Sequence, residues 1–135
     1  MINEDLLRRI EGEIYFNILE ISNVEFQKKL WFGHYKNYWS SYVELMCMLF
    51  DDNQFNLFIQ QYTSLLHYSS DFTTKLSCLR DSLKNFNKED NKSDIEIVND
   101  PEWIQISKLA KEIINEWTPV PNLSGMEEFV ILSKE

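Results

Sequence analysis

Glycine, proline and cysteine are all scarce in this chain of 135 residues, which has three glycines, three prolines and two cysteines. Gly12, Gly33 and Gly125 are too few and too far apart to build the glycine-rich loops that hold nucleotide phosphates. Two cysteines allow one disulfide at most, whereas small secreted scaffolds depend on several. Phosphate-binding loops and a disulfide framework are therefore excluded.

Histidine is equally rare, and the common catalytic and metal-binding patterns are missing. His34 and His67 are the two histidines, and neither an HExxH nor a CxxC spacing supplies a pair of zinc ligands. Ser69 and Ser70 follow His67, but no GxSxG nucleophile turn accompanies them. We therefore predict no metal, no cofactor and no catalytic residues, and we expect that the protein is not an enzyme.

Basic residues are too few and too scattered for direct binding to nucleic acid. Thirteen Lys and Arg residues oppose 22 Asp and Glu residues, which gives a net charge of −9. Proteins that bind DNA or RNA need clustered cations, and the longest basic cluster here is a pair. No direct nucleic-acid partner is expected.

Long hydrophobic runs are absent as well. The most apolar run, residues 45–50, is far shorter than the roughly 20 residues of a membrane span. The first residues are acidic, where a signal peptide needs positive charge. We therefore expect no membrane association and a cytoplasmic location. There Cys47 and Cys78 would be reduced, and their place in helical patterns predicts that they are buried.

Apolar residues, at 44% of the chain, are abundant enough for the core of one domain spanning residues 1–135. Their spacing of three and four predicts a helix over residues 4–21. Gly12 and several β-prone residues nevertheless leave residues 13–21 open between helix and strand. Two parallel apolar stripes then predict one long core helix up to residue 50, which Gly33 could kink or interrupt.

Several short patterns mark the expected starts of helices. Ser22 with Glu25 has the form of a capping box, and Asp51 with Gln54 has a similar spacing. Asp71 precedes another helical pattern. Asp100 before Pro101 is the strongest start signal, and the helix after it should end at residues 118–121.

The end of the chain suggests a different structure. Residues 129–132 are β-prone and form either a terminal strand or a docked segment, and the alternating residues 95–97 could pair with them. The predicted fold is therefore mainly α, a compact bundle of about five helices. A small two-stranded sheet near the C-terminus stays open as an addition to the bundle.

The acidic residues are concentrated in one short segment. Residues 87–102 contain six acids and two bases, so almost half of the net charge lies in sixteen residues. The segment is either a solvated linker whose acids cap helices or a docking surface for a basic partner, which would relieve the repulsion between like charges. In the second case the candidate contact residues are Glu89, Asp90, Asp94 and Glu96.

An aromatic cluster adds a second candidate contact. Six aromatic residues lie between residues 31 and 42, at helical spacing typical of a core helix. Trp and Tyr are also enriched at binding hot spots, and one helix face cannot bury six of them. Tyr35 and Trp39 are therefore candidates for partner contact, although Trp39 and Trp103 are also expected to stabilise the fold by burial.

In size, acidity, helical pattern and lack of catalytic motifs, the chain resembles the small immunity proteins of bacterial toxin systems, including contact-dependent growth inhibition. The acidic stretch of residues 89–102 and the helix that begins Pro101-Glu102-Trp103-Ile104 carry this resemblance. It implies that a monomer binds a cognate toxin, commonly a basic nuclease, and blocks its active site or substrate surface. Acidic side chains would take the places of substrate phosphates, and aromatic anchors would supply buried area.

Two alternatives belong to other classes. The chain could be a helical adaptor or regulatory subunit whose apolar groove holds a partner helix, for which an obligate homodimer would be typical. It could also be a small helical enzyme with a site scattered along the sequence.

Overall fold

The computed structural model describes residues 2–33, 39–86, 92–121 and 127–134, apart from the side chains of residues 127–129 and 132. These residues are mainly helical, as predicted, and contain no strand. In chain order the helical elements, including two π-helical turns, η1 and η2, are α1 (Glu4–Ile21), α2 (Val24–Trp31), α3 (Tyr42–Met46), η1 (Cys47–Asp52), α4 (Phe55–Leu57), η2 (Phe58–Tyr62), α5 (Thr63–Leu65), α6 (Ser70–Phe86), α7 (Asp94–Val98), α8 (Pro101–Glu116) and α9 (Glu127–Lys134). The described chain therefore has more and shorter helical elements than the expected five.

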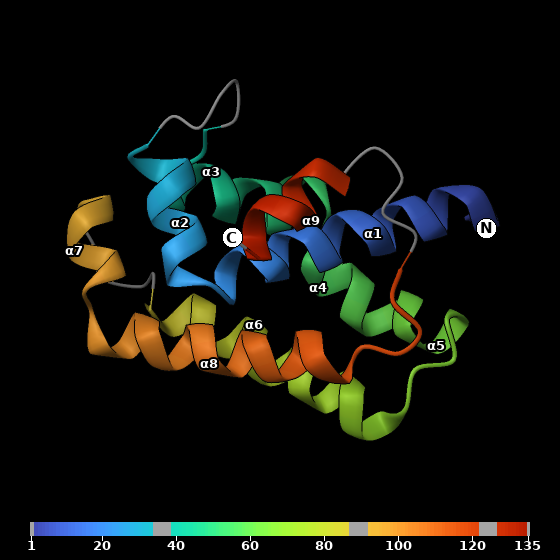
Figure 1. Ribbon diagram of the computed structural model, residues 1–135. Coiled ribbons are helices and arrows are strands. Elements are labelled where there is room, and N and C mark those ends of the chain that lie inside the picture. Colours follow the sequence, from blue (N-terminus) through green and yellow to red (C-terminus); the bar gives the residue numbers. More distant parts are fainter. Residues whose placement is uncertain (1, 34–38, 87–91, 122–126, 135) are drawn as a thin grey trace.

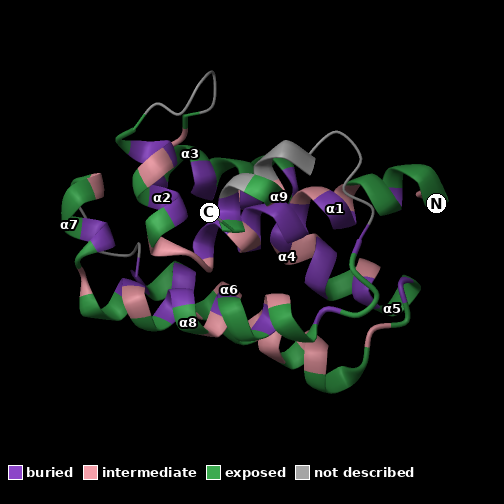
Figure 2. Cartoon of the chain, viewed as in Figure 1, coloured by how far each residue is buried: buried purple, intermediate pink, exposed green. Residues whose placement is uncertain are grey.

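Helix α8 is central to the packing, because it lies against α1 on one side and α6 on the other (Figure 1). The buried residues of these helices face one another, and their exposed residues face outward (Figure 2). Trp103 of α8 is fully buried, as predicted, with the rings of Tyr42 and Phe86 centred 5.4 Å away. Its indole nitrogen donates to Oε1 of Gln27, 2.8 Å away, and Gln27 Nε2 in turn donates to the carbonyl oxygens of Glu20 and Ile21. This chain of hydrogen bonds ties α8 to the junction between α1 and α2.

Helix α1 settles the open question about residues 13–21, which are helical to Ile21. The side chain of Asn3 accepts from the amide of Leu6 and starts the helix. The predicted capping box at Ser22 is wrong, because Ser22 ends α1 and its hydroxyl donates to the carbonyl of Leu19. Asn23, one residue later, is the N-cap of α2.

The predicted continuous helix up to residue 50 is also wrong, because α2 ends at Trp31 and α3 begins only at Tyr42. Gly33 follows the last turn of α2, where an added Cβ would lie 2.7 Å from the carbonyl oxygen of Lys29. The chain therefore leaves the helix where glycine permits a close backbone approach. The amide of Ser40 returns to the carbonyl of Leu30, and Ser41 caps α3.

The remaining start signals have mixed outcomes. Asp100 caps α8 by accepting from the amide of Glu102, with Pro101 as the first helical residue, so this prediction is confirmed. The helix ends at Glu116, before the predicted stop at residues 118–121. Asp51 does not cap a helix, because it lies inside η1. Before α6 the capping side chain is Ser69, which accepts from the amide of Phe72, and not Asp71.

The proposed sheet near the C-terminus is wrong. Residues 95–97 belong to α7, which Ser93 and Glu96 start with a reciprocal capping box. Residues 129–132 lie in α9, whose Ser133 carbonyl accepts from Asn23 Nδ2 at 2.8 Å. The capping box at the start of α7 and the hydrogen bond that holds α9 to Asn23 outweigh the β-propensity of these two segments.

Two predictions about burial are wrong as well. Cys47 and Cys78 are free thiols, as expected, but both are exposed. Trp39 has 64% of its surface exposed, so it does not stabilise the core. Because the predicted helix is interrupted after Trp31, the stripe that assigned Trp39 to the core face does not continue through it.

Candidate functional site

Helices α2, α3 and α7 lie toward one end of the molecule (Figure 1), and they and the residues next to them carry several exposed apolar side chains. We call this set the apolar patch, and it consists of Phe32, Trp39, Val43 and Ile95, which are 41% to 66% exposed. Phe32 and Ile95 line one shallow cavity of about 370 Å³ together with Val98. Apolar side chains that are grouped rather than scattered on a surface commonly mark an interaction site.

Two hydrogen bonds fix the residues next to Trp39 and Val43 to α2 and α7. Asp94 Oδ1 accepts from the amide of Tyr42 at 3.3 Å, which joins the start of α7 to the start of α3. Ser40 is fixed on α2 by its bond to the carbonyl of Leu30, 3.0 Å away. The sequence predicted Trp39 and the acids of residues 94–96 as separate candidates, and the structure brings them to one end of the fold.

The acids beside the patch have structural duties of their own. Glu96 accepts from the amide and hydroxyl of Ser93 at 3.0 Å, and the bond from the backbone amide is the main reason why its pKa is lowered. Asp100 bonds to Lys92, and this contact chiefly lowers the pKa of its carboxyl. Both groups therefore stay ionised around neutral pH, and the helix-capping interpretation of this segment holds for Glu96 and Asp100.

The charge that remains around the patch is negative. Lys28 lies 3.7 Å from the carboxylate of Glu25, and Lys92 is held by Asp100, so these two lysines have acidic partners within the chain. Glu44 on α3 is exposed. With Asp94 and Glu96 it forms an acidic border to the apolar residues.

Three predicted contact residues, Glu89, Asp90 and Tyr35, lie outside the described residues. Three residues of the apolar patch, Phe32, Val43 and Ile95, were not among the contact residues predicted from the sequence. One signal could have identified Ile95. The run Ile95-Glu96-Ile97-Val98 puts three apolar residues into less than two helical turns, and so short a helix cannot bury all of them on one side.

A second cluster contains the histidine considered above, and its contacts are structural. The hydroxyl of Tyr68 donates to Glu11, which also pairs with Arg8 at 3.2 Å, and accepts from Trp117 Nε1 at 3.1 Å. Burial raises the pKa of Tyr68, so its hydroxyl stays protonated. His67 and Ser69 line the same cavity of about 720 Å³, but the hydroxyl of Ser69 is engaged as a helix cap.

The described part of the chain lacks two further features. It contains no group of three or more His, Cys, Asp and Glu side chains placed to hold a metal ion. No helix within the same ranges has the length and hydropathy needed to cross a bilayer.

The sequence matches no protein-family model, and comparisons with curated proteins and with solved structures found no significant match. The function is therefore argued from the residues alone.

Proposed function

We propose that this protein is an immunity protein that binds a basic bacterial toxin through the apolar patch and its acidic border. The toxin is expected to be of nuclease type, and binding would cover its active site or substrate surface. The observation that carries the proposal is Trp39, a large aromatic side chain that is 64% exposed, together with the exposed Phe32 and Ile95, which line one cavity.

The composition of the patch suits a protein partner. Aromatic residues supply much of the energy at binding hot spots, which have an apolar centre and a polar rim. Here Trp39 and Phe32 form the apolar part, and Glu44, Asp94 and Glu96 form the rim. Acidic rim groups would accelerate the approach of a cationic protein, and the net charge of −9 acts in the same direction.

The form of the cavity favours a toxin over the partner helix of the adaptor alternative. A volume of about 370 Å³ between Phe32, Ile95 and Val98 suits one or two anchoring side chains. A helix laid in a groove needs a row of such sites along several turns. The adaptor hypothesis therefore has less support at this surface.

The proposal can be tested with the protein encoded next to this gene, co-expressed in a bacterial host. If that neighbour arrests growth, we expect the wild-type chain to restore it and the variant Trp39→Asp or Ile95→Asp to fail. Leu65→Asp is the matched control, because Leu65 is 52% exposed but lies in α5, outside the patch.

Each variant must first show the circular dichroism spectrum and melting temperature of the wild-type chain. A neighbour without toxicity, or a toxin still neutralised by both folded patch variants, would refute the proposed role of this surface. An obligate homodimer that shields the patch would favour the adaptor instead.

A further inference from the structure

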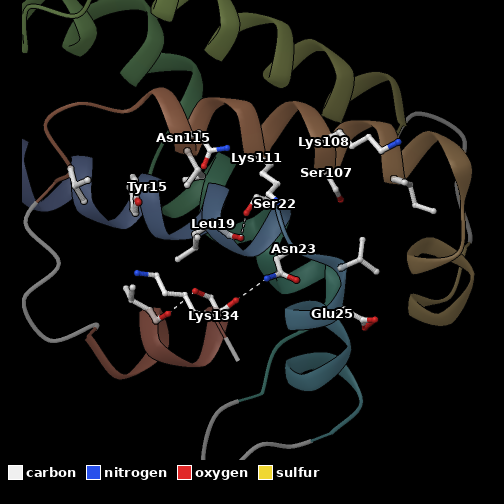
Figure 3. A pocket seen from close by; sticks show the side chains of 16 residues that line it. Tyr15, Leu19, Ser22, Asn23, Glu25, Ser107, Lys108, Lys111, Asn115 and Lys134 are labelled. Atoms are coloured by element: carbon white, nitrogen blue, oxygen red, sulfur yellow. Dashed lines mark hydrogen bonds between the residues drawn. The ribbon is translucent and has the colours of Figure 1, made fainter.

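A third hollow lies away from the patch, where the junction of α1 and α2 faces α8 and α9 (Figure 3). Its volume is about 650 Å³, which is within the range of small-molecule sites. Leu19, Val24, Ile104, Ile114 and Val130 give it largely apolar walls. Asn23 closes one edge by its bond to the carbonyl of Ser133 in α9.

The border of this hollow is positive, in contrast to the chain as a whole. Three lysines, Lys108, Lys111 and Lys134, line it against a single acid, Glu25. None of the three lysines forms an ion pair with another described residue, whereas Glu25 already faces Lys28. In a protein with a net charge of −9, this is a local excess of cations without ion-pair partners among the described residues.

One buried hydroxyl in the wall also lacks a partner. Ser107 is only 4% exposed, and its Oγ has no hydrogen bond within the described part of the chain. Figure 3 shows this hydroxyl directed from α8 into the hollow, on the same helix as Lys108 and Lys111. An unsatisfied buried hydroxyl costs about 1–3 kcal/mol. The other two serines at this site are satisfied, Ser22 by the carbonyl of Leu19 and Ser133 by the carbonyl of Val130.

We propose that this hollow binds a small anionic amphiphile, a carboxylate attached to an alkyl chain. The alkyl chain would cover the apolar wall between α1 and α8, the carboxylate would lie between Lys111 and Lys134, and Ser107 would donate its free hydroxyl. Tyr15 lines the same hollow, and burial raises its pKa, so its phenol remains a neutral donor. This site does not depend on the toxin-binding role proposed for the patch.

Decanoate, below the concentration at which it forms micelles, is a suitable probe for calorimetric titration of the full chain. We expect saturable binding with one site per chain. Decanol and decylammonium have the same alkyl chain but a neutral or a positive head, so they should bind at least tenfold more weakly.

Substitutions then locate the site. The double variant Lys111→Gln with Lys134→Gln should weaken decanoate binding about tenfold, from two partly exposed charge contacts. Lys84→Gln removes one exposed charge of α6 away from the hollow and is the control. Ser107→Ala should also weaken binding severalfold while leaving the unliganded protein as stable as before or more so, because it removes the unpaired hydroxyl.

Three results would overturn the proposal. The first is no saturable binding of decanoate to the folded wild-type chain. The second is equal affinity for decanoate, decanol and decylammonium, which would show non-specific binding of the alkyl chain. The third is unchanged decanoate affinity in both Ser107→Ala and the folded double lysine variant, which would place the ligand elsewhere.

Discussion

Replacing Glu20 with glutamine tests how the ionisation of one buried carboxyl affects stability. This carboxyl accepts a hydrogen bond from Ser40, the residue after Trp39. Glu20 is 5% exposed, and its Oε2 accepts from Trp31 Nε1 at 3.0 Å and its carboxyl from Ser40. Burial raises the pKa of this carboxyl to about 7, and the charge of Glu44 acts in the same direction. The two hydrogen bonds lower the pKa but do not compensate for burial.

The consequence for stability follows from the two pKa values. In the unfolded chain the carboxyl titrates near 4.5, and in the folded protein near 7. Between these values the folded state holds a proton that the unfolded state has released, so the free energy of unfolding falls as pH rises. This difference between the two pKa values corresponds to about 3 kcal/mol in the free energy of unfolding. The full amount is lost above pH 7, and none of it is lost below about pH 4.

Glutamine keeps the shape and the hydrogen-bond acceptor but cannot ionise. We therefore expect Glu20→Gln to raise the free energy of unfolding by up to about 3 kcal/mol at pH 8 and to leave it unchanged at pH 4. Urea denaturation followed by tryptophan fluorescence across this pH range would measure the difference. Glu13→Gln, on the same helix but only half-buried, removes the same charge without removing a buried carboxyl and is the matched control.

An equal effect of Glu20→Gln at pH 4 and pH 8 would refute the reasoning, because the gain could then not come from ionisation. A loss of stability at pH 8 would do so as well. It would show that the hydrogen bonds from Trp31 and Ser40 to the carboxylate outweigh its desolvation.

Three further predictions concern packing, thiol exposure and the end of α2. Trp103→Ala should cost about 3–5 kcal/mol in urea denaturation and Trp39→Ala less than about 0.5 kcal/mol; equal losses would contradict the assigned burial. Cys47 and Cys78 should both react rapidly with a thiol reagent in the folded protein, since both are exposed, and two labels found only after denaturation would show that they are buried. Gly33→Ala should destabilise the chain by about 1 kcal/mol or more, because the new methyl group would press on the carbonyl of Lys29; an unchanged melting temperature would show that the backbone relaxes there.

The sequence alone was sufficient for the features that depend on neighbouring residues. Helical periodicity identified α1, α6 and α8, and Asp100 before Pro101 located the start of α8 to the residue. Other caps were displaced by one or two positions, at Ser22 and Asp71. In each case several residues that can cap stand side by side, and local chemistry does not choose between them.

The candidate site was predicted only in part, for a related reason. The acidic segment and Trp39 were identified separately from charge and aromatic content. The two segments that contain them are joined by the hydrogen bond from the Tyr42 amide to Asp94, across more than fifty residues of sequence. The hollow between α1, α8 and α9 was not predicted at all, because the sequence left residues 129–132 open between a terminal strand and a docked segment.

Composition and local pattern therefore determined the fold class, the acidity and the lack of common catalytic motifs. Tertiary structure decided which apolar residues are buried. Periodicity assigns a residue to a face only while one helix continues, and the helical phase is lost where α2 ends beside Gly33. Trp39 follows that break and is exposed, whereas Tyr42 begins a new helix and packs on Trp103, because the position of each depends on where the chain returns to the core.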